Sequence, residues 1–371
     1  MKRLHLFNPD NDLALAANLA NYTPPPAAAR LRSAGQTLPL WYGADGDRFV
    51  STGTDARWLD AMREAFGMDV DVFPYRPELF VPEPWGWSAA ARSDFLHLGY
   101  GADALPSPRA IDAIRQLSHR RTATALHALL PQHYLTPAAI EVKSVDELDH
   151  AMQRLGDAVV KLPWSSSGRG VFGISAAELA ARRASIEGAI RRQGSVMVEP
   201  KLDKGTDFAM LFDISGGTAT FQGLSLFQSD ICTGYAGNIL MPQKDMEQTI
   251  KAAAGTAAFD AVRDAMAPAL QKIIGTAYSG PLGIDFFTVG HTGRIALAEI
   301  NLRRTMGRLC LDFYTRYAAA GARGTFRISP RTITAAAPAT APPQIFNGRL
   351  HSGTIALNPP GAPFNFTVTL R

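Results

Sequence analysis

The 371-residue chain is long enough for two or three domains with sizeable hydrophobic cores. Hydrophobic residues make up 46% and charged residues 19%, as in ordinary globular proteins, and no apolar run approaches the roughly 18 residues of a membrane span. The formal net charge of +4 comes without a dense block of Lys and Arg alternating with aromatic residues, so neither nucleic-acid nor membrane binding is indicated. This mild basicity fits an anionic small-molecule substrate.

The two cysteines, Cys232 and Cys310, share no metal-binding or redox spacing. Asp10 and Asp12 interrupt the N-terminal segment before it could form the apolar core of a signal peptide. We therefore expect free thiols in a reducing compartment, and a cytoplasmic protein.

The N-terminal third alternates between strand and helix patterns. Residues 3–7 predict a buried strand ending in the polar loop 8–12, and the Ala/Leu-rich helix that follows is broken by TPPP. LPLWYG predicts a strand, TDARWLDAMREAFG an amphipathic helix, MDVDVFPY a strand and VPEPWGW a loop. This alternation is typical of a parallel sheet with crossover helices, although the first strand lacks the dinucleotide-binding fingerprint.

The loop after the first strand offers a weak ligand site. Parallel sheets bind ligands at the carboxyl ends of their strands, so Asp10 and Asn11 could contact a substrate amine or hydroxyl. Capping of the next helix by Asp10 or Asp12 is an equally good interpretation.

Three further helices and a domain boundary follow. Residues 105–137 predict two helices, the first capped by Ser107 and the second by Ser118, with a boundary near Gln116. SVDELDHAMQRLG then predicts a helix capped by Ser144, with Glu147 at the capping-box position.

A lysine and a small-residue loop come next. Val159 and Val160 predict a strand that delivers Lys161, and a Ser/Gly loop leads to a returning strand at 171–174. Bare backbone N–H groups in such a loop can close over phosphates, with the lysine adding positive charge. The loop is not a Walker A motif, and a flexible hairpin with one exposed lysine is an equally good interpretation.

A second strand, 195–198, ends at Glu199 and leads through Pro200 and the connector to Asp207 and the strand FAMLFDI. Backbone groups of such a connector can bind a purine edge, and a following carboxylate suits ribose hydroxyls. Residues 221–238 show no familiar pattern, and residues 245–275 predict one helix.

The stretch from Gly280 to Gly307 contains two apolar runs around a short Gly-containing loop, which predicts a β-hairpin. A turn centred on Thr292 pairs Gly290 with Arg294 and places Asp285 opposite Glu299, with Asn301 on the same face. Two carboxylates held so close among apolar residues need a cation, a shared proton or water. Hard divalent cations suit such oxygen ligands. The alternatives are a surface hairpin with two solvated acids, or a one-residue slip that moves Asp285 to the other face.

These motifs in this order, over about residues 118–307, resemble the ATP-grasp superfamily. The resemblance implies an ATP-dependent enzyme that binds nucleotide and Mg²⁺, with Mn²⁺ as an alternative metal. The residues that it implies for nucleotide binding are Arg120, Arg121, Lys161, Ser165, Ser166, Ser167, Gly168, Gly170, Glu199, Lys201, Leu202 and Asp207. It implies Asp285, Glu299 and Asn301 for the metal, and Arg303 and Arg304 for catalysis. Many members carry a lysine where this chain has Arg120 and Arg121, and either arginine could replace it.

The resemblance also implies a fold class and a domain organisation. We expect an α/β protein with a Rossmann-like pre-ATP-grasp domain at 1–115. An ATP-grasp domain of two α+β subdomains follows at 116–320, with its lid at about 116–200. Residues 321–371, with the Ala/Pro linker 335–343, are expected to form a small C-terminal β extension.

The expected activity is ligation of a small-molecule or peptide carboxylate to an amine or similar nucleophile, through an acyl phosphate. A phosphotransferase acting on a hydroxyl and a non-catalytic ATP-binding module are the alternatives, and an intact set of metal ligands disfavours the module. No protein nucleophile of the Ser-His-Asp or Cys-His kind can be singled out.

Overall fold

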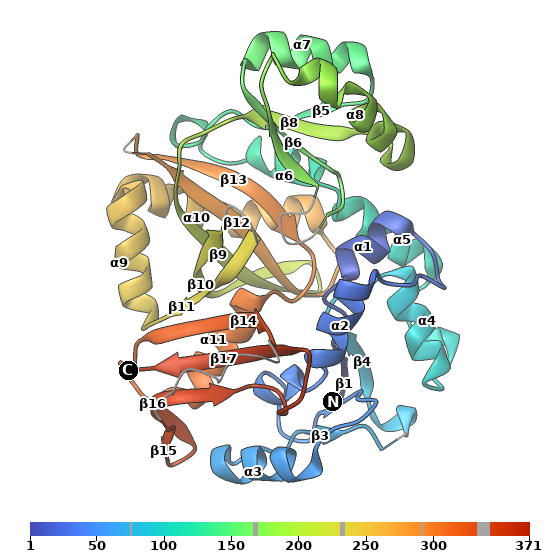
Figure 1. Ribbon diagram of the computed structural model, residues 1–371, viewed down its shortest axis with the longest axis vertical. Coiled ribbons are helices and arrows are strands. Elements are labelled where there is room, and N and C mark those ends of the chain that lie inside the picture. Colours follow the sequence, from blue (N-terminus) through green and yellow to red (C-terminus); the bar gives the residue numbers. More distant parts are fainter. Residues whose placement is uncertain (75, 166–169, 231–233, 291, 332–341) are drawn as a thin grey trace.

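The computed structural model describes residues 1–74, 76–165, 170–230, 234–290, 292–331 and 342–371. It contains a parallel sheet near the N-terminus, a small antiparallel sheet at the top of Figure 1 and a long antiparallel sheet that runs through the rest of the molecule. The mixed α/β fold class expected from the sequence is confirmed.

The N-terminal sheet has four parallel strands in the order β3-β2-β1-β4, as the strand and helix alternation predicts. The prediction of a loop at VPEPWGW is wrong for the first half of this segment, because Val81–Pro84 forms β4. This strand lies at the sheet edge, where prolines without an N–H group are tolerated. The other strands are β1 (Arg3–Leu6), β2 (Arg48–Phe49) and β3 (Asp71–Val72). The helices are α1 (Asn11–Ala17), α2 (Pro26–Ala34), α3 (Ala56–Phe66) and α4 (Ala89–His97), with short 3₁₀ helices η2 (Pro77–Leu79) and η3 (Ala102–Ala104).

The prediction of a strand at LPLWYG is wrong, because Leu38–Trp41 forms the 3₁₀ helix η1. All four side chains are buried, and an unbroken apolar run does not distinguish a buried strand from a buried helix. Pro39 fits the first turn of a helix, where a missing N–H costs little. Trp41 donates its indole N–H to the carbonyl of Leu357 at 2.7 Å, which ties η1 to the C-terminal part of the chain.

Two of the four predicted helix caps are confirmed. Ser107 accepts from the backbone N–H of Ala110 at the start of α5 (Pro108–Leu117), and Ser144 accepts from that of Glu147 at the start of α7 (Val145–Leu155). The other two are wrong. Ser118 donates to Ile114 at the end of α5, and α6 (Arg121–His127) begins beyond it. Asp10 stands at the N-cap of α1 without a side-chain capping bond, and Asp12 forms an ion pair with Arg303.

The small sheet at the top of Figure 1 has its own core and lies within the segment predicted as the lid, so we call it the lid sheet, although its role as a lid stays a prediction. Its strand order is β5-β8-β6-β7, and all pairs are antiparallel. Val160 and Val198 face helices α7 and α8, so alternation directs Lys161, Met197 and Glu199 to the opposite face. The bounds are β5 (Ile140–Val142), β6 (Ala158–Lys161), β7 (Val171–Ile174), β8 (Val196–Pro200) and α8 (Leu179–Gln193); the 3₁₀ helix η4 (Gln132–Tyr134) precedes β5.

The long sheet has nine strands in the order β13-β12-β9-β10-β11-β14-β17-β16-β15. Its first half packs against two helices where the sequence predicted one. That prediction is wrong because Gly255, with φ of +86°, ends the first helix and starts the second in a conformation that other residues avoid. The bounds are β9 (Lys204–Ser215), β10 (Thr218–Asp230), β11 (Gly234–Leu240), β12 (Gly280–Val289), β13 (Arg294–Asn301), α9 (Gln243–Ala254) and α10 (Thr256–Ile274).

The C-terminal strands extend this same sheet, because β14 pairs with β11 and β17 pairs with β14. Phe366 and Val368 share a core with Trp41 from the N-terminal segment. The red strands accordingly lie beside the blue segment in Figure 1. The domain boundaries near residues 115 and 320 stay predictions. The remaining bounds are α11 (Met306–Tyr317), β14 (Gly324–Pro330), β15 (Gln344–Phe346), β16 (Arg349–Ala356) and β17 (Phe364–Leu370).

In the described ranges no helix is both long and apolar enough to cross a membrane. Cys310 is a buried free thiol, and Cys232 lies outside the described residues.

Candidate active site

The hairpin of β12 and β13 holds the predicted carboxylate pair. Asp285 pairs with Glu299, as the sequence predicts, and Gly283 pairs with Asn301. At the turn the prediction is wrong by one residue, because Val289, not Gly290, pairs with Arg294. The register shifts between Asp285 and Phe286, where a β-bulge leaves the extra residue on β13, and this shift restores the predicted register at the carboxylates.

The two carboxylates have different electrostatic surroundings. Burial raises the pKa of Asp285, and the neighbouring charge of Glu299 raises it further. Burial also acts to raise the pKa of Glu299, but Arg120, Lys161 and Arg303 together hold that pKa below its usual value. The pair therefore favours one shared proton near Asp285 when no cation lies between the two carboxylates.

Asn301 and Arg303 extend this cluster toward the N-terminal sheet. The amide nitrogen of Asn301 donates to Asp285 at 3.0 Å, and its oxygen accepts from Arg303 Nη2 at 2.9 Å. Arg303 also donates from Nε at 3.0 Å and from Nη2 at 2.6 Å to Asp12 Oδ2. Both side chains of this ion pair are largely buried, so a residue at the start of α1 fixes an arginine 291 positions later.

Arg304 lies beside Arg303 but has different partners. It donates to Asp312 at 2.6 Å and to Glu83 at 3.4 Å, and its guanidinium lies 4.0 Å from the ring centroid of Tyr42. The structure does not bring the Arg304 side chain to the carboxylate pair. These contacts instead anchor the segment that carries Arg303 to β4 and α11.

The adjacent arginines Arg120 and Arg121 point to different places. Arg120 is largely buried, forms an ion pair with Glu299, and donates to the carbonyl of Leu162 at 3.0 Å. Arg121 is half exposed and donates to Gln116 at 2.6 Å. Of the two candidates, the structure brings Arg120 to the carboxylate pair.

The described ends of the Ser/Gly loop lie next to Arg120. Ser165 accepts from Arg120 Nη2 at 3.1 Å. The N–H of Leu162 donates to the carbonyl of Gly170 at 2.8 Å and closes the base of the loop. Gly170 has φ of +78°, and a Cβ there would lie 2.8 Å from Leu162, so the closure requires glycine. Ser166, Ser167 and Gly168 lie outside the described residues.

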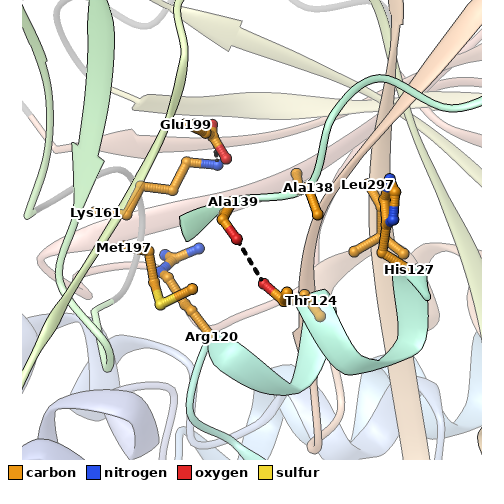
Figure 2. Close-up of a pocket in the computed structure, with 11 residues that line it drawn as sticks. Arg120, Thr124, His127, Ala138, Ala139, Lys161, Met197, Glu199 and Leu297 are labelled. Carbon is orange, nitrogen blue, oxygen red and sulfur yellow. Dashed lines mark hydrogen bonds and ion pairs between the residues drawn. The ribbon is translucent and has the colours of Figure 1, made fainter. Parts of the chain in front are cut away.

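A pocket opens between the lid sheet, α6 and β13, with about 300 Å³ of space that includes its open mouth. Lys161 and Glu199 form a buried ion pair at 2.5 Å on the lid side. Figure 2 shows this pair and Arg120 on one side, with Leu297 and His127 on the other. Thr124 donates to the carbonyl of Ala139 at 3.2 Å across the pocket floor. The lining residues are Arg120, Ala123, Thr124, His127, Ala138, Ala139, Lys161, Met197, Glu199, Leu297 and Ala298.

The predicted connector residues lie outside this lining. The backbone N–H of Lys201 donates to Asp157 at 3.1 Å, so it is already used, and the Lys201 side chain is exposed. Leu202 is partly buried. Asp207 forms an ion pair with Lys204 at 2.7 Å. A role in nucleotide binding stays a prediction for all three.

The donor set at the hairpin suits a hard divalent cation that takes its other ligands from water and phosphate. Among the described residues no three His, Cys, Asp or Glu side chains form a metal-binding group, and the hairpin supplies two carboxylates and one amide. Mg²⁺ binds in this way, through one or two carboxylates. A half-turn of the Asn301 amide would direct its oxygen toward such an ion.

Met197, Leu297 and Asp12 contribute to the site but are not among the site residues predicted from the sequence. Met197 and Leu297 supply apolar walls of the pocket. Each stands two residues before a predicted acid, Glu199 or Glu299, and that repeated spacing could have identified both. Asp12 was interpreted only as a possible cap, and no local pattern connects it with Arg303.

The site thus lies in a fold made of a small antiparallel sheet, a larger antiparallel sheet carrying an acidic hairpin, a pocket between them and a preceding α/β segment. No protein-family model matches the sequence, and a comparison with curated proteins finds no match. Comparison with solved structures does find similar folds.

Biotin carboxylase from Campylobacter jejuni, in a complex described as β-γ-ATP, is similar with a TM-score of 0.55 and 11% identity, over 100% of this chain and 88% of that one. N5-carboxyaminoimidazole ribonucleotide synthetase from Thermus thermophilus is similar with a TM-score of 0.50 and 15% identity, over 99% of this chain and 93% of that one. The biotin carboxylase domain of Hydrogenobacter thermophilus 2-oxoglutarate carboxylase was crystallised with MgADP, ADP and bicarbonate. It is similar with a TM-score of 0.50 and 11% identity, over 99% of this chain and 85% of that one. At such identities the likeness is one of fold.

Proposed function

We propose that this protein is an ATP- and Mg²⁺-dependent ligase that activates a carboxylate as an acyl phosphate for attack by an amine or similar nucleophile. The observation that carries the proposal is the opposed pair Asp285 and Glu299, with Asn301 and Arg303 at its end and Arg120 joining it to the pocket. Two of the proteins of similar fold are biotin carboxylases crystallised with adenine nucleotides, which supports the same class of chemistry.

The side chains that line the pocket support this proposal. Met197 and Leu297 offer apolar surfaces for a purine ring, and Lys161 and Arg120 supply charges for phosphates. Asp285, Glu299 and Asn301 would hold Mg²⁺, which supplies positive charge to phosphate oxygens when bound. Arg303 lies beyond Asn301, where its positive charge would stabilise the negative charge that develops on the transferred phosphoryl group.

The order of bond changes follows from this chemistry. A substrate carboxylate oxygen attacks the γ-phosphorus of ATP, the bond to the β-phosphate oxygen breaks, and ADP leaves. The nucleophile then attacks the acyl carbon and expels inorganic phosphate, and a base takes its proton. Positioning and charge neutralisation by Arg120, Lys161 and Arg303 are the protein's part, because the reaction requires no protein nucleophile.

The test of this reaction uses hydroxylamine in place of the unknown nucleophile. Pools of carboxylic acids, including amino acids and short peptides, are incubated with the protein, ATP, Mg²⁺ and hydroxylamine. We expect one pool to give a hydroxamate together with equal amounts of ADP and phosphate. A stable phosphorylated product with ADP, but with neither hydroxamate nor phosphate, would identify a phosphotransferase. If the protein binds nucleotide but turns over no acid or alcohol, the result would favour the alternative of a non-catalytic ATP-binding module.

Lys161→Ala tests the nucleotide site separately. The loss of a charge-assisted contact should weaken ATP binding by about 1.5–3 kcal/mol, with a smaller loss for adenosine, in calorimetric titrations. Because the substitution leaves Glu199 without its partner, Lys161→Ala/Glu199→Gln is the matched control for the effect of the unpaired carboxylate. Equal losses for ATP and adenosine would mean that Lys161 does not contact phosphates.

A further inference from the structure

Arg120 connects three parts of the site that are distant in the sequence. Its three guanidinium nitrogens contact the Leu162 carbonyl at 3.0 Å, the Ser165 hydroxyl at 3.1 Å and the Glu299 carboxylate. Its backbone N–H donates to the carbonyl of Pro163 at 3.2 Å. The side chain is only 9% exposed, so these contacts are largely shielded from water.

Each cation proposed for the phosphates has a carboxylate partner in this structure. Arg120 is paired with Glu299, Lys161 with Glu199, and Arg303 with Asp12. Only the first of these pairs joins a proposed phosphate ligand to a proposed metal ligand. Glu299 therefore cannot be fully available to a metal while Arg120 holds it, and Arg120 cannot be fully available to a phosphate.

We propose that Arg120 exchanges partners between Glu299 and polyphosphate, so that a divalent cation and a polyphosphate anion bind this protein cooperatively. A dication at Glu299 repels the guanidinium and replaces its ionic bond, which releases Arg120 toward phosphate oxygens. By linkage, phosphate bound to Arg120 releases Glu299 for the metal to the same extent. Arg120 is a positioning residue in this exchange, and the inference rests on the proposed nucleotide and metal function.

The chain offers a matched pair of variants for this inference. Glu299→Gln and Asp285→Asn each remove one proposed metal carboxylate, but only Glu299→Gln removes the ionic partner of Arg120. Calorimetric titrations with ADP in EDTA should show about fivefold or greater tightening for Glu299→Gln, a coupling at the lower end of the usual range. Asp285→Asn should bind ADP in EDTA as the wild type does, and adenosine affinity should be the same in all three proteins.

A double variant completes the test. Adding Arg120→Gln to Glu299→Gln should abolish the tightening, and Arg120→Gln alone should reduce the gain in ADP affinity that Mg²⁺ gives to the wild type. Arg120→Lys serves as a second variant if Arg120→Gln does not fold, and it should also reduce that gain, because lysine lacks the fork that reaches all three partners. Mg²⁺ also binds ADP in free solution, but this binding is the same in every titration and cancels when the variants are compared.

The outcomes separate this inference from the proposed function. Equal tightening in Glu299→Gln and Asp285→Asn would overturn the exchange and indicate a general effect of removing negative charge. An unchanged Mg²⁺ gain in Arg120→Gln would also overturn it, while ADP binding itself would preserve the proposed function. A wild-type protein that binds neither ADP nor adenosine, with or without Mg²⁺, would overturn both.

Discussion

Asp285→Asn is expected to abolish turnover and, in the absence of metal, to raise the melting temperature at neutral and alkaline pH. Activity should fall by at least roughly 100-fold, because a charge that positions the cation in the transition state is lost. The stability effect has the opposite sign, because the substitution removes one of two opposed carboxylates and relieves their repulsion. An asparagine at position 285 can still accept the hydrogen bond from Asn301 through its amide oxygen.

The stability effect should depend on pH in one direction. The folded-state pKa of Asp285 is raised by burial and by Glu299, whereas an Asp in the unfolded chain titrates near about 3.9. Below that value both states are protonated, so wild type and variant should melt alike. As the pH rises from that value to the folded-state pKa, only the unfolded state has released the proton, so the wild type progressively loses stability and the variant does not. Thermal melts in EDTA from about pH 4 to about pH 8 should therefore diverge, with the higher melting temperature in the variant.

Glu187→Gln is a matched control for the loss of one negative charge. Glu187 lies on the exposed face of α8 in an ion pair with Arg191, far from the hairpin in sequence. This variant should change neither turnover nor the pH dependence of melting by much. If Asp285→Asn melts well below the wild type in EDTA at about pH 8, the Asp285 carboxylate stabilises the fold. That pH is about four units above the reference pKa of Asp.

The hairpin illustrates how far the sequence reasoning could reach. Strand alternation and a Gly-containing loop predict the hairpin and place Asp285 opposite Glu299, because both signals are local. The turn register was wrong by one residue, and the bulge on β13 corrected it before the carboxylates. Bulges depend on how a strand pairs with its neighbours, and here β12 also pairs with β9 on its other side. The confirmed pairing therefore rests on two departures from the simple register that cancel.

The unpredicted contacts are long-range. Arg120 and Arg121 are adjacent, and only the folded chain shows that Arg120 faces Glu299 while Arg121 faces Gln116. The pairing of Asp12 with Arg303 joins residues 291 positions apart, and no periodicity carries that information. For the same reason the C-terminal strands could be predicted as strands, but their continuation of the long sheet could not.

Arg303→Met is expected to destabilise the protein strongly, and the cause should be the carboxylate that it leaves behind. Asp12 is largely buried and receives three N–H contacts from Arg303, so removal of the arginine leaves a buried charge without its partner. Loss of one partner from such a pair typically costs about 3–5 kcal/mol. Urea denaturation should show this loss in the free energy of unfolding.

The double variant Asp12→Asn/Arg303→Met separates stability from chemistry. Without the buried carboxylate, most of the lost stability should return, because an amide and a thioether are much less costly to bury than one unpaired charge. Turnover should not return, because the positive charge proposed to stabilise the transferred phosphoryl group is still missing. The single variant Asp12→Asn keeps Arg303 and should retain part of the activity.

These four proteins form a double-mutant cycle with two readouts. Coupling between Asp12 and Arg303 in unfolding free energy, together with a loss of turnover that follows Arg303 alone, would assign the pair a structural role and Arg303 a chemical one. If turnover instead recovers with stability in the double variant, Arg303 has no charge-specific part in the reaction. The N-terminal segment would then support the site only by fixing the end of β13, through the Asp12 contact and the bond from the Arg304 N–H to the Trp85 carbonyl at 2.8 Å.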